Sequence, residues 1–342
     1  MHSGSPLISV LMPVYNCAKY LSEAVDSIIY QTYDNWELLI CDDGSRDESV
    51  QIMSNYALID SRIKAFTNGE NRGAAHTKNL LIKKAKGEFI ALMDADDISD
   101  KNRLRAQLMF LKENCLDACG THHRTIDEDG VILERHLNYG EYEQILWSAF
   151  SNFSFCNASL LIKRECLLKI GGYNEALRSE AEDIDMLSRF LLSGYKIQTI
   201  NKVYYIYRQH AKSVSQRSNT LQKHNSYIVT KCIISKILGS ECSDEFARFM
   251  KYFHRPDFKH DGDCLFLFAT LKTLVAEVEN QILAGRFKNK SVKMDIAKKL
   301  LFLAVNDRHN SKVRSFMLLL QSIWFLPSIA CLTLKKKWRA AL

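Results

Sequence analysis

The sequence predicts an α/β fold, in which a doubly wound, mostly parallel sheet is followed by an α-helical C-terminal extension. Up to about residue 219, short apolar runs alternate with segments whose apolar residues recur at helical spacing, as in sheets whose parallel strands are joined by helices. From residue 220 onward the pattern is helical and basic. We therefore expect two domains, residues 1–219 and 220–342, which suits a chain of 342 residues with 47% hydrophobic composition.

The first part of the chain supplies four predicted strands, each of which is short and largely apolar, and the run at 89–93 is unbroken and bounded by polar residues. These strands lie at residues 7–12, 36–41, 63–67 and 89–93, with helices between them at residues 18–31, 47–56 and 74–84. Polar clusters follow three of the strands, at residues 13–16, 42–45 and 94–97. Because parallel strands end at the same edge of a sheet, we expect these clusters to converge where open α/β sheets bind their ligands.

Later segments continue the alternation of strands and helices. We expect a helix at residues 102–112, a strand near 116–121, a hairpin turn at 127–130, a strand at 157–162 and a helix that begins at Glu182. Two edge strands are expected at residues 196–200 and 203–208. Residues 253–262 contain Pro256 and several polar residues, which favours a loop.

Three carboxylates, Asp94, Asp96 and Asp97, follow the buried strand at 89–93. Carboxylates crowded in this way repel one another, and a hard divalent cation with oxygen ligands, Mg²⁺ or Mn²⁺, relieves the repulsion. An Asp-x-Asp at a strand end therefore suggests a metal that holds a diphosphate. A solvated acidic turn is the alternative for this triplet alone, and the convergence of the three polar clusters favours the metal site.

Charge divides the chain unevenly. Residues 1–219 carry 25 Lys and Arg against 29 Asp and Glu, whereas residues 220–342 carry 21 against 10. The basic C-terminal part points to an anionic surface, either a membrane or a nucleic acid. Ten cysteines are scattered without a CxxC pair, and no secretory signal pattern is present, so we expect reduced thiols in a cytoplasmic protein.

Residues 316–334 carry no charge and are flanked by basic residues on both sides. Their length approaches the roughly 20 residues that span a bilayer, but polar residues and Pro327 interrupt the centre. We favour a helix that lies in the membrane interface with residues 312–342 on anionic headgroups, and a buried C-terminal helix is the alternative. We expect a peripheral protein on the inner face of the cell membrane and no nucleic-acid partner.

Seven short motifs occur in an order and spacing that resembles the family 2 glycosyltransferases of the GT-A fold, a Rossmann-like architecture. The resemblance covers about residues 6–217. The motifs are Pro13-Val14-Tyr15-Asn16, Asp42-Asp43-Gly44-Ser45, Asn71-Arg72-Gly73, Asp94-Ala95-Asp96-Asp97, Gly171-Gly172-Tyr173-Asn174-Glu175, Glu182-Asp183 and Tyr207-Arg208-Gln209-His210.

The resemblance implies an inverting transferase that moves a sugar from a nucleotide-diphospho-sugar, a UDP-sugar, to a glycan or lipid-linked acceptor in cell-surface polysaccharide synthesis. It assigns the catalytic base to Asp183. The Asp-x-Asp spacing at a strand end gives the Mn²⁺ or Mg²⁺ to Asp96, and His210, which follows another strand, suits a further metal ligand, a diphosphate contact or a structural role. The expected nucleotide-sugar contacts are Pro13, Tyr15, Asp43, Lys78, Asp94 and Arg208. Lys78 stands where the family usually has Arg, so the bidentate fork of a guanidinium is lost at that position.

Other interpretations of these residues remain open at this point. Asp42 to Ser45 also suits a turn, and Glu182 with Asp183 suits the first turn of any helix, where the helix dipole favours acids. A sugar-phosphate nucleotidyltransferase also uses an Asp-rich metal site, but would carry a Gly-rich basic loop where this chain has residues 13–16. A non-catalytic nucleotide-sugar-binding module would not need Asp96 or Asp183, and both are present.

Overall fold

The computed structural model describes residues 5–137, 140–150, 155–178, 180–211, 220–252, 264–285 and 288–306. These residues form two compact units. The first lies within Met1–Ile145 and Ser154–Ser226, and the second within Leu146–Phe153 and Tyr227–Leu342. The predicted α/β fold with a helical C-terminal extension is confirmed.

Four parallel strands form one half of the sheet of the first unit, in the order β3-β2-β1-β4. They are β1 (Ile8–Val14), β2 (Trp36–Asp42), β3 (Ile63–Thr67) and β4 (Phe89–Leu92). The chain builds outward from β1 to β3 and then returns to place β4 on the other side of β1. In doubly wound sheets such a reversal of strand order opens a crevice beyond the carboxyl ends of the two central strands, here β1 and β4.

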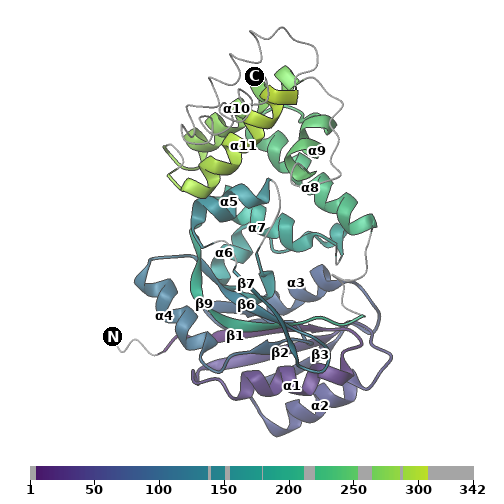
Figure 1. Ribbon diagram of the computed structural model, residues 1–342. Helices are drawn as coiled ribbons and strands as arrows, with labels where there is room; N and C mark the ends of the chain where they lie inside the picture. Colours follow the sequence, from purple (N-terminus) through teal and green to yellow (C-terminus); the bar gives the residue numbers. More distant parts are fainter. Residues whose placement is uncertain are drawn as a thin grey trace. The chain divides into compact units, whose positions relative to one another are not determined.

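Helices cover both faces of this parallel half. Figure 1 shows α1 (Ala18–Ile29) and α2 (Ser49–Ile59) on one face and α3 (Ala74–Lys84) on the other. Every residue of β2 and β4 is buried, which explains the unbroken apolar sequence of β4 and the apolar run from Leu38 to Cys41 in β2; Glu37 of β2 is buried with partners at Ser9 and Lys64. Apolar residues of α1 at helical spacing, Leu21, Val25 and Ile28, join the same core. The alternation of strands and helices in the sequence therefore corresponds to a sheet with helices packed on both of its faces.

Mostly antiparallel strands extend the sheet beyond β4, in the order β4-β8-β6-β9-β5, with β7 paired to β6. The additional elements are β5 (Ile98–Ser99), α4 (Arg103–Glu113), β6 (Ala118–Ile126), β7 (Ile132–His136), α5 (Tyr142–Ala149), β8 (Leu161–Lys163), α6 (Arg164–Lys169), α7 (Glu182–Leu192) and β9 (Ile197–Arg208). Only β6 and β9 are parallel in this half. The sheet is thus mixed, with its parallel half at the N-terminal strands.

Two expectations about strands were wrong. The segments at 196–200 and 203–208 are one strand, β9, which lies inside the sheet between β6 and β5. Asn201 and Lys202, which separate the two expected segments, lie in the same strand at a register shift opposite Thr121 and His122. The strand expected at 157–162 is a 3₁₀ turn, Asn157–Ser159, followed by β8.

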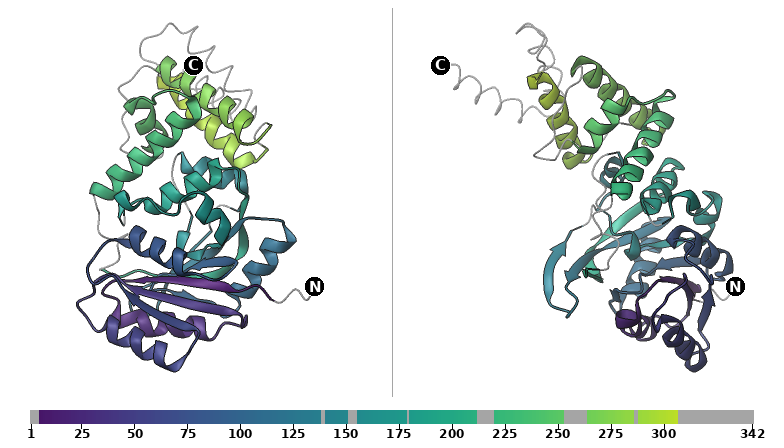
Figure 2. Two further views of the ribbon diagram at one scale, coloured as in Figure 1. Left: turned by 180° about the vertical axis from the view of Figure 1, so that it is seen from behind. Right: turned by 90° about the vertical axis from the view of Figure 1, so that its right-hand side faces the viewer.

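The second unit is helical in the part that the structure describes. Its helices are α8 (Thr220–Leu238), which begins in the first unit, α9 (Asp244–Tyr252), α10 (Cys264–Gln281) and α11 (Lys290–Asn306); α10 and α11 pack side by side (Figure 2). Lys299 is fully buried and pairs with Asp295, which also accepts a hydrogen bond from Trp147. None of the described helices is long and apolar enough to cross a membrane. The predicted loop at 253–262 and the segment 312–342 lie outside the described residues.

Candidate active site

A cavity of about 790 Å³ lies in the first unit at the carboxyl ends of β1, β2 and β4. Its other walls come from the start of α7 and the end of β9. Eight of the nine site residues that the sequence suggests line it: Pro13, Tyr15, Asp43, Lys78, Asp94, Asp96, Asp183 and His210. Arg208 is not among the lining residues. The polar clusters that follow β1, β2 and β4 therefore do converge.

The turn after β2 is shaped by Asp42 and Gly44. The Asp42 carboxylate accepts the backbone N–H groups of Gly44, at 3.0 Å, and of Ser45, at 3.2 Å. Gly44 has a φ of +79°, and a Cβ there would lie 2.6 Å from the carbonyl carbon of Glu70. Only glycine suits both the left-handed backbone and this close approach. Asp42 therefore stabilises the turn, as one of the two interpretations of residues 42–45 expected, whereas Asp43 lines the cavity.

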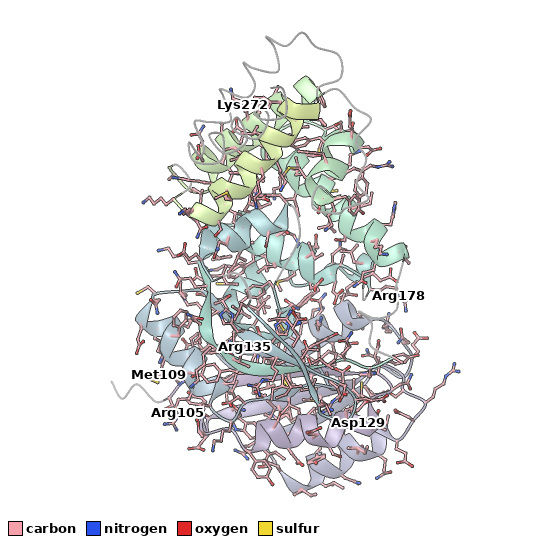
Figure 3. The ribbon with its side chains drawn as sticks, viewed as in Figure 1. Arg105, Met109, Asp129, Arg135, Arg178 and Lys272 are labelled. Atoms are coloured by element: carbon pink, nitrogen blue, oxygen red, sulfur yellow. The ribbon has the colours of Figure 1, made fainter. Side chains whose placement is uncertain are left out.

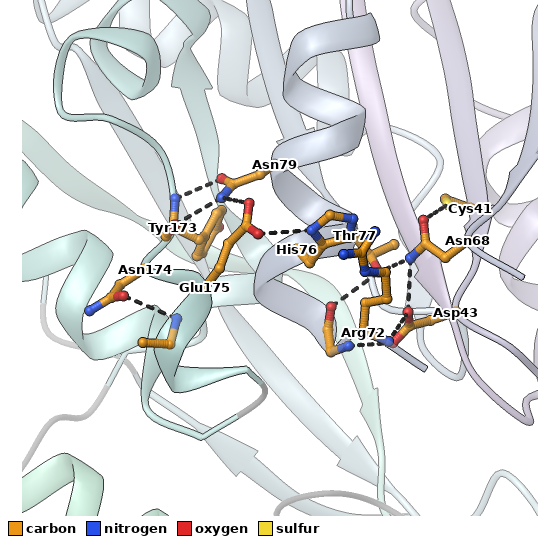
Figure 4. A network of polar contacts seen from close by, with 12 residues as sticks. Cys41, Asp43, Asn68, Arg72, His76, Thr77, Asn79, Tyr173, Asn174 and Glu175 are labelled. Carbon is orange, nitrogen blue, oxygen red and sulfur yellow. Dashed lines mark hydrogen bonds and ion pairs between the residues drawn. The ribbon is translucent and has the colours of Figure 1, made fainter. Parts of the chain in front are cut away.

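Asp43 fastens the loop at residues 68–73 beside the cavity. One oxygen of its carboxylate accepts Asn68 Nδ2 and the Arg72 backbone N–H, both at 2.8 Å, and the other accepts the Gly73 backbone N–H at 2.9 Å (Figure 4). The Asp43 residue is only 4% exposed. Its position is therefore fixed by three donors before any ligand binds.

The loop after β1 presents Tyr15 on the cavity wall with 43% of the residue exposed. Asn16 is left-handed, with a φ of +53°, and ties this loop to the turn after β2. Its N–H donates to Ser45 Oγ and its Oδ1 accepts the Arg46 N–H, both at 2.8 Å. Tyr15 is thus a large exposed ring on a loop that neighbouring residues hold in place.

The acidic cluster after β4, Asp94, Asp96 and Asp97, brings three carboxyl groups close together, and of these residues Asp97 is buried and Asp94 is partly buried. Burial, together with the charges of Asp96, Glu182 and Asp183, raises the pKa of Asp94 to about 6, although Lys78 opposes the shift. Burial, then the charges of Asp96 and Asp94, raise the pKa of Asp97 well above its usual value. Concentrated negative charge of this kind favours the approach of a cation.

Asp96 lies 2.9 Å from His210, measured from Oδ2 to Nε2. The pair brings together the end of the β4 loop and the residue two positions beyond β9. Within the described residues, no group of three or more His, Cys, Asp or Glu side chains is arranged to hold a metal by itself. A carboxylate and an imidazole nonetheless fit Mn²⁺ or Mg²⁺ when substrate or water oxygens complete the coordination, as is usual for these ions beside phosphates.

Glu182 and Asp183 form the first turn of α7, which follows Ala181 at a φ of +69°. Burial, then the charge of Glu182, raises the pKa of Asp183 to about 6, and Lys78 acts in the opposite direction. Asp183 is therefore a stronger base than an exposed aspartate and is still deprotonated at neutral pH. A left-handed alanine costs of order 1 kcal/mol, and backbone strain of this kind is typical of functional sites.

Lys78 pairs with Glu182, with Nζ and Oε1 3.0 Å apart, and both side chains are about nine-tenths buried. Burial lowers the pKa of Lys78, but the charge of Glu182 and further acidic neighbours outweigh it, and the net direction is upward. The lysine therefore stays charged and links α3 to α7 beside Asp183. The sequence placed Lys78 at the site but gave no sign of this ion pair.

The loop at residues 171–175 is held by Asn79 of α3. Its Nδ2 donates to Tyr173 O and its Oδ1 accepts the Tyr173 N–H, both at 2.8 Å, and His76 contacts Glu175 at 2.8 Å (Figure 4). Gly172 has a φ of +67°, and a Cβ there would lie 2.4 Å from Asn79 Oδ1. Helix α3 thus supports both the loop fastened to Asp43 and the segment that leads to α7.

Arg103 was missed by the sequence reasoning. It is fully buried behind β4, where its Nη2 donates to Leu92 O at 2.8 Å and to Ala158 O at 3.1 Å. Its guanidinium carbon lies 5.0 Å from the centre of the Tyr205 ring, and the Tyr205 hydroxyl accepts the Asp94 backbone N–H at 3.2 Å. Arg103 therefore supports the strand that carries the acidic cluster. Nothing in a helical segment that carries both Arg103 and Arg105 signals that Arg103 is the one that points inward.

Comparison with known proteins gives consistent results. A family model described as glycosyl transferase family 2 matches residues 9–171. EpsE of Bacillus subtilis (strain 168) is 33% identical over 232 residues, which are 67% of this chain and 82% of EpsE. Staphylococcus aureus TarS 1–349 in complex with UDP-GlcNAc superposes with a TM-score of 0.60 at 19% identity, covering 88% of each chain.

A second solved structure has a similar fold. The mannosyltransferase PcManGT of Pyrobaculum calidifontis, in complex with GDP-Man and Mn²⁺, superposes with a TM-score of 0.53 at 18% identity. The match covers 98% of this chain and 88% of PcManGT. At such identities the two structures establish only the fold of this chain, and each match is long enough to include part of the helical C-terminal region.

Proposed function

Because the chain belongs to glycosyl transferase family 2 and has the GT-A fold, we propose that it is an inverting enzyme that moves a sugar from a UDP-sugar to an acceptor hydroxyl. The acceptor is a glycan or a lipid-linked saccharide in bacterial polysaccharide synthesis. The resemblance found in the seven sequence motifs is confirmed. One observation carries the proposal: a single cavity holds Asp183, with its raised pKa, together with the Asp94, Asp96 and His210 cluster.

The proposed chemistry needs one base. Asp183 takes the proton of the acceptor hydroxyl as the hydroxyl oxygen attacks the anomeric carbon, and the bond to the nucleoside diphosphate breaks on the opposite face of the sugar. A pKa of about 6 suits this role, because the carboxylate is deprotonated near neutral pH and still basic enough to accept a proton. Lys78, paired with Glu182, offsets part of the negative charge beside Asp183 and limits the rise of its pKa.

The donor nucleotide is proposed to bind between the loops after β1 and β2. Tyr15 offers an exposed ring for stacking, which contributes about 1–3 kcal/mol per base where it has been measured. Asp43 would accept hydrogen bonds from the nucleoside, with Pro13 and Asp94 beside it. TarS was solved with UDP-GlcNAc and PcManGT with GDP-Man, which supports a nucleotide-sugar donor, and of the two we propose the uridine nucleotide.

Asp96 and His210 are proposed to hold Mn²⁺ or Mg²⁺, together with oxygens of the donor diphosphate. When bound there, the ion neutralises the charge that develops on the leaving diphosphate, so no general acid is required on that side. The complex of PcManGT with GDP-Man and Mn²⁺ supports this assignment.

The test is a donor panel. Purified full-length protein is incubated with Mn²⁺ and UDP- or GDP-sugars, with and without a lipid-linked acceptor, and nucleoside diphosphate release and the anomeric configuration of the product are measured. We expect release from a UDP-sugar, stimulated by acceptor, with inverted configuration. Pyrophosphate formed from a nucleoside triphosphate and a sugar phosphate would instead identify a nucleotidyltransferase. Donor binding without turnover on any acceptor would identify a binding module.

A further inference from the structure

Arg208 does not face the cavity, although its position in the sequence suggested a diphosphate contact. Its side chain is only 3% exposed, and it is absent from the residues that line the cavity. We propose that Arg208 is a positioning residue, which fixes the Asp96–His210 pair from behind. The inference rests on the proposed function, because it assumes that this pair binds the metal.

The first support comes from the contacts of Arg208 with the acidic turn. Its Nε donates to the backbone carbonyl of Asp96 at 3.1 Å, and its own backbone N–H donates to Asp97 Oδ1 at 2.7 Å. Two bonds therefore join the end of β9 to consecutive residues of the turn. His210 follows two residues later, so these bonds set the position from which its Nε2 reaches Asp96 Oδ2.

The outer nitrogens of Arg208 are engaged by two further elements. Nη2 pairs with Glu23 of α1, and Nη1 donates to the carbonyls of Asp127 and Glu128 at 3.4 Å. Both carbonyls belong to the turn of the β6–β7 hairpin, whose Asp129 is labelled in Figure 3. The guanidinium thus connects β9, the acidic turn, α1 and the hairpin.

Tyr20 of α1 completes the arrangement. Its ring centre lies 4.8 Å from the guanidinium carbon of Arg208 and 4.8 Å from the centre of the His210 ring. One aromatic ring therefore contacts both Arg208 and the imidazole that we assign to the metal. Arg suits this position because its planar fork can donate in several directions at once, whereas a Lys ammonium keeps the charge but not this geometry.

The substitution Arg208→Lys tests the inference in the full-length protein. Mn²⁺ binding is followed by the EPR signal of free Mn²⁺, and the affinities for UDP and UMP are measured by calorimetry in EDTA. Loss of the outer partner of a metal ligand typically weakens metal binding about 10–100-fold, and we expect a loss of that size. The preference for UDP over UMP in EDTA should be unchanged, because the inference gives Arg208 no contact with the diphosphate.

Lys19→Gln is the matched control. Lys19 pairs with Glu128 at 2.9 Å and so joins α1 to the same hairpin turn, but this ion pair is exposed and does not touch Asp96. The control should bind Mn²⁺ as the wild type does. A Lys19→Gln variant as defective as Arg208→Lys would overturn the inference, since docking of the hairpin alone would then explain the effect.

Further results of the same measurements would support or overturn the positioning role of Arg208. An Arg208→Lys protein with normal Mn²⁺ affinity but no preference for UDP over UMP would make Arg208 a diphosphate contact. If circular dichroism shows that this variant does not fold, Glu23→Gln, which changes an exposed partner, should weaken Mn²⁺ binding in the same direction, and an unchanged affinity would refute the inference. Wild-type protein that binds no Mn²⁺ would overturn the proposed metal site and this inference together.

Discussion

The titration of Asp183 should be visible in the rate. Because burial and Glu182 raise its pKa to about 6, lowering the pH through about 6 protonates the base, and kcat/KM should fall about tenfold per pH unit below that point. An aspartate with its usual pKa, near 3.9, would retain activity to about pH 4. The measurement is a pH profile of kcat/KM for the acceptor. The affinity for UDP, measured over the same pH range, distinguishes protonation of Asp183 from protonation of Asp94, because we place only Asp94 beside the nucleotide. A kcat/KM profile that is flat down to pH 4 would contradict the assignment of Asp183 as the base.

Replacing the base should affect turnover more than binding. Asp183→Asn keeps the shape of the side chain and removes its basicity, so kcat should fall about 10²–10⁴-fold while the KM for the donor stays nearly constant. Asp185→Asn is the control on the same helix turn, because Asp185 pairs with Arg189 and does not line the cavity. A variant of Asp183 with normal kcat would move the base elsewhere.

Between elements, the ion pair of α3 and α7 should contribute to stability. Lys78→Met leaves the Glu182 carboxylate buried without its partner, which typically costs about 3–5 kcal/mol. Adding Glu182→Leu removes the isolated charge and should restore most of the loss. Urea unfolding of the wild type, the single variant and the double variant measures both effects. A double variant less stable than the single variant would show that the two residues act independently.

Prediction from the sequence was most accurate where a local pattern or the direction of the strands determines the structure. The strand Ile63–Thr67 and the helix Ala74–Lys84 have the predicted bounds, and the three polar clusters meet at the cavity because strand direction alone brings them there. The unity of β9 was not predictable, since a register shift depends on the partner strand. The direction of Arg208 depends on acceptors 80 to 185 residues away in the sequence. Arg103 bonds Gln107 one helical turn away, but its burial depends on carbonyls 11 to 57 residues away, which no local pattern encodes.

At the scale of the whole molecule, the basic charge of residues 220–342 predicts that the protein binds to anionic membranes. Residues 312–342 lie outside the described residues, and we propose that they associate with the inner face of the cell membrane. Lys335, Lys336 and Lys337 would each contribute about 1 kcal/mol near an anionic surface. Full-length protein should float with anionic liposomes, less so at high salt, and a variant with these lysines replaced by Gln should float less. Equal absence of both proteins from the lipid fraction would contradict membrane association.

The way in which Asp43 holds its loop has a consequence for divergence and design. Two of its three bonds go to main-chain N–H groups, at residues 72 and 73, and such donors persist whichever side chain a residue carries, proline excepted. Glu70 and Arg72 are exposed, so substitution of their side chains should not weaken the bonds that hold the loop. Related chains can therefore differ at these two positions and still keep the loop that Asp43 holds beside the cavity.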